Sequence, residues 1–300
     1  RGKMHACGHD GHTAMLLGAA RHLSANPDFD GTVHFIFQPA EENLAGGRVM
    51  VQDGLFERFP VEAVYGMHNW PGLPVGKFAA CVGPMMASAD FFELKLTGRG
   101  GHGAFPHLSR DPVLAAAHII TAWQSIVSRN TDPMKAAVIS ATQIESGFTG
   151  NVIPETAVIR GTTRTFDAGV QDMVEERMGA LARSLAEGFG MRADFRYDRR
   201  YAPTVNSPEE FGHAMAAARA LVGEANVNDH LTPVMGAEDF GWMLRERPGC
   251  YVFVGNGEGQ QGGCEVHNPN YDFNDDTLPV GAAYWSQLVR MQLPADRAAG

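Results

Sequence analysis

The chain has 300 residues, of which 44% are hydrophobic and 19% are charged, and its formal net charge at pH 7 is −10. This length suffices for one large hydrophobic core or two smaller ones, and length alone favours about two domains. The acidic balance and the lack of any basic run argue against a general nucleic-acid-binding protein. No apolar run reaches membrane-spanning length, and the four scattered cysteines are typical of a reducing compartment. We therefore expect a cytoplasmic protein that binds neither nucleic acids nor membranes.

The first residues of the chain carry the densest group of metal-binding side chains. Three histidines and Cys7 fall between Met4 and His12. Thiolate and neutral imidazole are the preferred ligands of zinc and related divalent ions. Cys7 and His9 are two positions apart, so an extended backbone would point both side chains to the same side. Residues 13–23 have helical periodicity, which places these candidate ligands on the loop that enters a helix.

Two short apolar runs further along the chain also end in polar residues. Residues 32–37 and 63–67 are rich in β-branched and aromatic side chains and are predicted to be buried strands. Glu41 and Glu42 follow the first run, and His68 follows the second. Helical patterns alternate with these strands, which predicts an α/β domain. In open α/β sheets, ligands bind outside the carboxyl ends of the strands.

The pattern changes between residues 85 and 200. Its order is strand, helix, strand, strand, helix, strand, which is the split β-α-β arrangement. We predict an inserted, ferredoxin-like α+β domain over residues 85–200, within an α/β catalytic domain formed by residues 1–84 and 201–300. The predicted strands of the insert are 89–96, 136–144, 157–163 and 193–201, and its predicted helices are 112–128 and 170–188.

Helices and short apolar strands return after residue 200. Glu238 opens a short predicted helix, and a glycine-rich loop over residues 255–263 leads to His267. The other elements expected in the α/β domain are helices over 46–56, 207–223 and 279–293 and a strand over 251–254.

The candidates for chemistry together match the needs of a two-metal hydrolytic site. Such a site requires five or more ligands, one of them shared, and a carboxylate that takes a proton from water without being a ligand. Glu41 and Glu42 suit this division, because neighbouring side chains on a non-helical backbone point in different directions. Taken singly, a Glu-Glu pair is more often solvated surface. The histidines that we interpret as ordinary structural or solvated residues are His5, His12, His22 and His34.

Seven motifs stand in the order seen in one enzyme family. The chain resembles the aminoacylase/carboxypeptidase-type metallohydrolases, and within them the branch of hippurate hydrolases and indole-3-acetyl-amino-acid amidohydrolases. The resemblance covers essentially the whole chain, and several ordered motifs make it specific. The motifs are residues 4–12, Pro39–Glu42, Gly66–Asn69, Gly98–His107, Asn151–Pro154, Gly161–Arg164 and His267–Asp275.

The resemblance implies a catalytic domain with a mixed sheet flanked by helices and a dinuclear metal site. It also implies that the inserted domain is a lid used for dimerisation, so that a homodimer or homotetramer is expected. The two divalent ions would be Mn, Zn, Ni or Co, and Cys7 would bridge them. The residues that fall on the metal-ligand positions are Cys7, His9, Glu42, His68 and His267.

The same resemblance assigns roles to residues that bind no metal. Glu41 falls on the general base, and His102 on the lid falls on a histidine that binds the substrate carbonyl or the oxyanion. Asn151 and Arg164 match positions that hold the substrate carboxylate, a task that suits the guanidinium fork. Glu238 lies in a Gly-Ala-Glu-Asp-Phe motif and is given only a supporting role.

The activity that follows from the resemblance is hydrolysis of the amide bond of an N-acyl amino acid by a metal-activated water, with Glu41 as general base. One alternative is a dipeptidase or carboxypeptidase of the same family. Another is a thiol hydrolase in which His9 assists Cys7 as nucleophile. A third arises because family members normally carry a further N-terminal segment and this chain starts after it. In that case the chain would be a truncated, inactive fragment that dimerises through residues 85–200.

Overall fold

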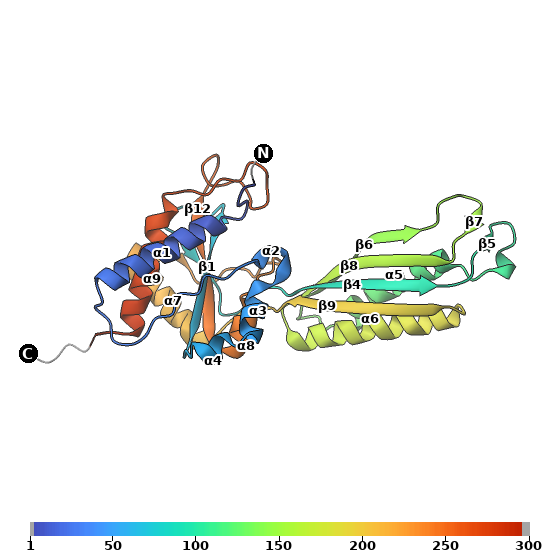
Figure 1. The fold of residues 1–300 in the computed structure, drawn as a ribbon, viewed down its shortest axis with the longest axis horizontal. Helices are drawn as coiled ribbons and strands as arrows, with labels where there is room; N and C mark the ends of the chain where they lie inside the picture. The colour runs from blue at the N-terminus through green and yellow to red at the C-terminus, as the bar shows by residue number, and fades with distance from the viewer. Residues whose placement is uncertain (1–2, 296–300) are drawn as a thin grey trace, which may run out of the picture. The chain divides into compact units, whose positions relative to one another are not determined.

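The computed structural model describes residues 3–295. Residues 1–2 and 296–300, which the predicted catalytic domain includes, lie outside the described residues. The chain divides into two compact units (Figure 1). The larger unit comprises residues 1–85, 205–233 and 242–300, and the smaller unit comprises residues 86–204 and 234–241. Within the described part of the chain, no helix is long and apolar enough to cross a membrane.

The larger unit is built on a mixed four-stranded sheet. Its strand order is β1-β12-β2-β11. β1 is parallel to β12, whereas β12 and β2 are antiparallel. All nine residues of β12 are buried, which explains why its sequence is a nearly continuous apolar run. The strands are β1 (Val64–Pro71), β2 (Phe78–Ala79), β11 (Val227–Asn228) and β12 (Gly249–Gly257).

Three long helices pack in the larger unit. α1 (His9–Ala25), α7 (Pro208–Val222) and α9 (Thr277–Gln292) form the contacts α1–α9, α7–α9 and α7–β12. The buried face of α1 includes Met15, Ala19 and Leu23, spaced as one stripe of a helix requires. The short helical elements are α2 (Glu41–Leu44), α3 (Gly46–Gln52), α4 (Leu55–Arg58), η3 (Glu224–Asn226) and, at the border of the two units, α8 (Gly241–Glu246).

Three predictions for the larger unit need correction. Residues 32–37 form no strand and are half-buried or exposed, because no strand among residues 3–295 pairs with them and β-branched residues alone do not hold a strand. The single helix predicted over 46–56 is broken between α3 and α4, where Gly54 takes a left-handed φ of 86°. β1 continues past its apolar run to Pro71, so that His68 lies inside the strand and not after its end.

The smaller unit contains a four-stranded antiparallel sheet with the order β6-β8-β4-β9. In chain order these strands alternate with two helices as strand, helix, strand, strand, helix, strand, which is the split β-α-β arrangement that the sequence pattern predicts. The elements are β4 (Ala89–Thr97), α5 (Pro112–Ser125), η2 (Ile126–Asn130), β6 (Ala137–Ser146), β8 (Thr156–Thr165), α6 (Ala168–Gly188) and β9 (Arg192–Tyr201). One short pair accompanies it in the smaller unit, β5 (Gly101–His102) with β7 (Val152–Ile153). A second short pair, β3 (Gly83–Met86) with β10 (Thr204–Asn206), lies where the chain passes from one unit to the other.

The helices of the smaller unit start where the sequence supplies caps. The Asp111 carboxylate accepts a hydrogen bond from the Val113 N–H at 2.9 Å, and Pro112 occupies the first helical position of α5. Between the helices and the sheet, Trp123 is fully buried, and its Nε1–H donates to the Met178 carbonyl of α6 at 3.0 Å. One large aromatic side chain thereby ties α5 to α6.

Candidate metal centre

The loop before α1 brings Cys7 close to strand β1. Gly8 takes a left-handed φ of 81°, and a Cβ atom at this position would lie 2.4 Å from the Tyr271 Oη and 2.5 Å from the Asn69 Nδ2. Only glycine fits both the backbone conformation and this close approach. The Cys7-Gly8-His9 motif is therefore a tight turn pressed against its neighbours.

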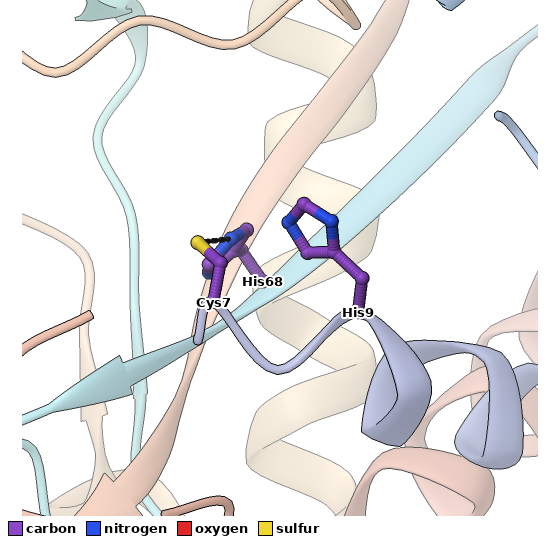
Figure 2. Close-up of side chains that lie close together, drawn as sticks. All are labelled: Cys7, His9 and His68. Atoms are coloured by element: carbon purple, nitrogen blue, oxygen red, sulfur yellow. Dashed lines mark hydrogen bonds between the residues drawn. The ribbon is translucent and has the colours of Figure 1, made fainter. Parts of the chain in front are cut away.

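The Cys7 sulfur lies beside the His68 ring of β1, and His9 stands at the other end of the turn (Figure 2). The Cys7 Sγ lies 3.3 Å from the His68 Nε2, and the His68 Nδ1 lies 2.7 Å from the Asn69 carbonyl oxygen. Because a carbonyl only accepts hydrogen bonds, the Nδ1 carries the proton, and the Nε2 lone pair points towards the thiol. His9 completes the group, with its ring perpendicular to that of His68 and the ring centroids 5.7 Å apart.

A second pair comes from segments far apart in the sequence. The His267 Nε2 lies 3.1 Å from a carboxylate oxygen of Glu42. The backbone N–H of His267 donates to the Ala6 carbonyl at 2.6 Å, which joins the loop of His267 to the loop of Cys7. The sequence contains no local signal for this pairing, because Glu42 and His267 are separated by 225 positions.

Backbone strain is concentrated around these residues. Among residues 3–295, the non-glycine residues with positive φ are Ala40 (55°), Ala45 (49°) and His267 (65°). The two alanines bracket α2, which carries Glu41 and Glu42. A left-handed conformation costs an ordinary residue about 1–2 kcal/mol, so the surrounding structure must hold it in place. Such strain clusters at functional sites.

Within the larger unit, the donor atoms gather into three overlapping groups. Within each group the atoms lie no more than 4.8 Å from one another. Zinc bonds to nitrogen, oxygen and sulfur are about 2.0–2.3 Å long, so two ligands of one ion lie at most about 4.6 Å apart. The limit of 4.8 Å is close to this value, and the donor types are those that bind divalent ions, so each group suits one ion. The groups are Cys7 with His9 and His68, Cys7 with Glu42 and His267, and His9 with Glu41 and Glu42.

The histidines of this site favour the neutral form. Burial lowers the pKa of His68, and burial together with the nearby His68 lowers the pKa of His9. Burial also lowers the pKa of His12 well below its usual range. Neutral imidazole is the form that binds a metal ion, so the pocket prepares these rings for coordination.

His12 and Asn69 belong to the surroundings of this site, although the sequence analysis gave them no role in it. His12 packs against His68 with ring centroids 4.4 Å apart, and its Nε2 accepts the Asn69 N–H at 2.9 Å. His12 was expected to be an ordinary structural histidine, and its hydrogen-bonded ring agrees with that interpretation. The sequence does carry one signal that His12 lies near the site. His9 and His12 are three positions apart, which places them on one face of helix α1.

The residues predicted to bind substrate are spread over the smaller unit. His102 pairs with Val152 in the β5–β7 pair, next to Asn151, and both His102 and Asn151 are exposed. Arg164 lies eight positions along β8 from Thr156, or roughly 26 Å at the rise of a strand. Its guanidinium donates to the Thr162 hydroxyl and, at 2.9 Å, to the Thr163 carbonyl. The smaller unit thus brings His102 and Asn151 together and leaves Arg164 near the opposite end of its sheet.

Glu238 lies just before α8 and is buried, with 6% of its surface exposed. Its carboxylate accepts a hydrogen bond from the Phe240 N–H at 3.2 Å. This local bond helps to shape the turn into α8. The supporting role expected for Glu238 at the site stays a prediction.

The mixed α/β sheet and the clustered donor residues define the class of metal-dependent hydrolases. The model of the peptidase family M20/M25/M40 matches residues 1–291, and the chain belongs to this family.

Curated relatives and a solved structure agree with this assignment. An N-acetylcysteine deacetylase of Bacillus subtilis is 40% identical over 96% of this chain and 74% of its own length. A hippurate hydrolase of Campylobacter jejuni is 39% identical over 95% of this chain and 73% of its own length. The crystal structure of the Bacillus subtilis YxeP protein, described as a dinuclear metal-binding peptidase, superposes with a TM-score of 0.81 at 34% identity, over 96% of this chain and 73% of that one.

Proposed function

We propose that the larger unit holds two divalent ions. Cys7 is the residue that the group of His9 and His68 and the group of Glu42 and His267 have in common, and these two groups together contain all five proposed ligands. This shared membership is the observation that carries the proposal, and the dinuclear description of the related YxeP structure supports it. The ions would be Mn, Zn, Ni or Co, which all accept thiolate, imidazole and carboxylate ligands. The proposed ligands are Cys7, His9, Glu42, His68 and His267.

The two carboxylates of α2 have different roles in this proposal. Glu42 is the ligand, because it lies beside His267 and shares a donor group with Cys7 and His267. Glu41 is the general base that takes a proton from the attacking water and returns it to the departing nitrogen. Bound metal ions supply the polarisation of the substrate carbonyl and the acidification of that water.

The substrate class is that of N-acyl amino acids, whose amide bond is hydrolysed to a carboxylic acid and a free amino acid. Two relatives at 39–40% identity are named for this chemistry, one acting on N-acetylcysteine and the other on hippurate. A peptidase activity is the second candidate, because the solved YxeP structure is described as a peptidase. Both activities use the same donor set and the same general base.

Residues of the smaller unit complete the proposal as substrate-binding groups. His102 would stabilise the oxyanion. Asn151 precedes Val152, the residue that pairs with His102, and would bind polar groups of the substrate. Arg164 would bind the substrate carboxylate. The smaller unit itself would serve as a lid and as a dimerisation domain.

A thiol hydrolase predicts a different response from the same site. The thiol hydrolase expected from the sequence has His9 as the base that assists Cys7. His68, whose Nε2 lies 3.3 Å from the Cys7 Sγ, would suit the same task. That activity would withstand chelators and would be lost on alkylation of Cys7. It would leave Glu42 and His267 without a chemical role, which is why we favour the metal-dependent reaction.

The experiment that tests the proposal is hydrolysis of hippurate, N-acetylcysteine and a dipeptide, measured before chelation, after chelation and after Mn or Zn is restored. We expect activity on the N-acyl amino acids to vanish with the metal and to return with it. Activity that persists in the metal-free protein would support the thiol hydrolase. Absence of activity with every metal would favour the inactive, dimerising alternative.

A further inference from the structure

Asn69 joins three segments of the chain directly behind Cys7. Its Nδ2 donates to the Cys7 carbonyl at 2.7 Å, and its Oδ1 accepts the Tyr271 hydroxyl at 2.9 Å. Its backbone N–H donates to the His12 Nε2 at 2.9 Å. Asn69 is fully buried, and its bonds to Cys7 and Tyr271 are shielded from water.

Tyr271 belongs to the same loop as His267. That loop is attached to the N-terminal loop at two neighbouring carbonyls. The His267 N–H donates to the Ala6 carbonyl at 2.6 Å, and Tyr271 reaches the Cys7 carbonyl through Asn69. The backbone of the Cys7 turn is therefore held from the side of β1 and from the side of the C-terminal loop.

We propose that Asn69 and Tyr271 are positioning residues for the Cys7 thiolate. They hold it between the donor group of His9 and His68 and the donor group of Glu42 and His267. This inference rests on the proposed function, because it concerns the ligand shared by both groups. Asn69 bonds to the Cys7 backbone and not to its sulfur, and Tyr271 bonds to Asn69, so both act through Cys7. Distances in a metal site tolerate deviations of only about 0.2 Å. Loss of outer partners of metal ligands typically lowers affinity or activity about 10–100-fold.

The test measures metal binding by the thiolate and not turnover. The full chain is stripped of metal and titrated with Co²⁺ or Cd²⁺, while the charge-transfer absorption of a thiolate bound to the ion is followed. The variants are Tyr271→Phe, which removes one hydroxyl, Asn69→Ala, and the double variant. Tyr65→Phe is the matched control. Tyr65 is a half-buried tyrosine of β1, the strand that carries Asn69, and lies four positions before it.

We expect Tyr271→Phe to weaken binding about 10-fold and Asn69→Ala about 10–100-fold, with a weaker or shifted thiolate band. If both residues act through one chain of bonds, the double variant should bind about as weakly as Asn69→Ala alone. Tyr65→Phe should match the unsubstituted protein.

A purely structural role would give a different result. It would lower the unfolding temperature of the metal-free variants and leave the affinity and thiolate band of the folded protein unchanged, and that outcome would overturn the inference. Should Asn69→Ala fail to fold, Tyr271→Phe still decides the question, because it keeps the shape of the side chain. Absence of any thiolate band in the unsubstituted protein would instead contradict the proposed metal site itself.

Discussion

At the scale of single residues, the site shows how the surroundings select one chemical form of a side chain. The Asn69 carbonyl holds the proton of His68 on Nδ1 and leaves Nε2 directed at Cys7. Glu41 and Glu42 are adjacent in the sequence, and the Glu42 carboxylate lies 3.1 Å from the His267 Nε2. The proposed function gives these two identical side chains separate tasks, Glu42 as ligand and Glu41 as general base.

Replacing Glu41 by Gln is expected to abolish hydrolysis while leaving the metal content intact. The carboxamide keeps the size of the side chain but cannot take up the proton of water at neutral pH. Metal analysis and turnover of hippurate by the same preparation check this. Glu42→Gln is the matched comparison, and we expect it to lose metal as well. A Glu41→Gln variant that retains full activity would exclude the role of general base.

Acid is expected to destabilise the metal-free protein through its buried histidines. The pKa of His12 is lowered by burial in the folded protein, whereas it is about 6.5 in the unfolded chain. Below about pH 6.5 the unfolded chain therefore binds protons that the folded protein does not, and the free energy of unfolding falls as the pH falls. Above that value both states are neutral and the stability contribution is complete.

Denaturant unfolding at about pH 7.5 and pH 5.5 measures this effect, which amounts to at most about 1.4 kcal/mol per pH unit for each histidine. His12→Gln should show a smaller loss between the two pH values. An unchanged loss in that variant would mean that other groups carry the effect.

At the scale of elements, local pattern and tertiary environment agree except at a few places. The helices predicted over 112–128 and 170–188 appear as α5 and α6, because their caps and apolar stripes are local. The last turn of the predicted 112–128 helix differs, since residues 126–130 form a π-helical turn. Residues 32–37 form no strand in spite of their composition.

Replacing Trp123 by Ala is expected to destabilise the smaller unit by about 3–5 kcal/mol, the usual cost of removing a fully buried tryptophan. The change empties the space between the helices and the sheet and removes the hydrogen bond to Met178. Circular dichroism during denaturant unfolding measures the loss. Thr121→Ala, on an exposed position of the same helix, serves as control and should change the stability little. Equal stability of the two variants would contradict the packing described here.

At the scale of the whole molecule, β6 is an edge strand of the smaller unit's sheet. Ile144 pairs with Ile159 of β8, which is fully buried, yet Ile144 itself is 58% exposed. The nearby loop adds Phe148, which is 91% exposed. An edge strand with uncovered apolar side chains is a typical surface for pairing with another chain. We therefore propose this edge as the contact surface of the dimer that the proposed function includes.

Replacing Ile144 by Lys is expected to convert the proposed dimer to monomers, because a charged edge opposes strand pairing. Light scattering after size exclusion measures the mass, which should fall to that of one 32.4-kDa chain. Arg196→Ala, on the opposite edge strand β9, should leave the mass unchanged. A protein that is monomeric before substitution, or an Ile144→Lys dimer, would contradict this assignment of the interface.

The sequence by itself determined the types and order of the donor residues, most helices, and the split β-α-β order of the smaller unit. These features depend on side-chain spacing within one element or on motifs a few residues long. The tertiary structure alone decided that Glu42 meets His267, that Asn69 links Cys7 to Tyr271, and that residues 32–37 remain outside the sheet. The physical reason is that such contacts join residues far apart in the chain, and only the folded arrangement of whole elements brings them within bonding distance.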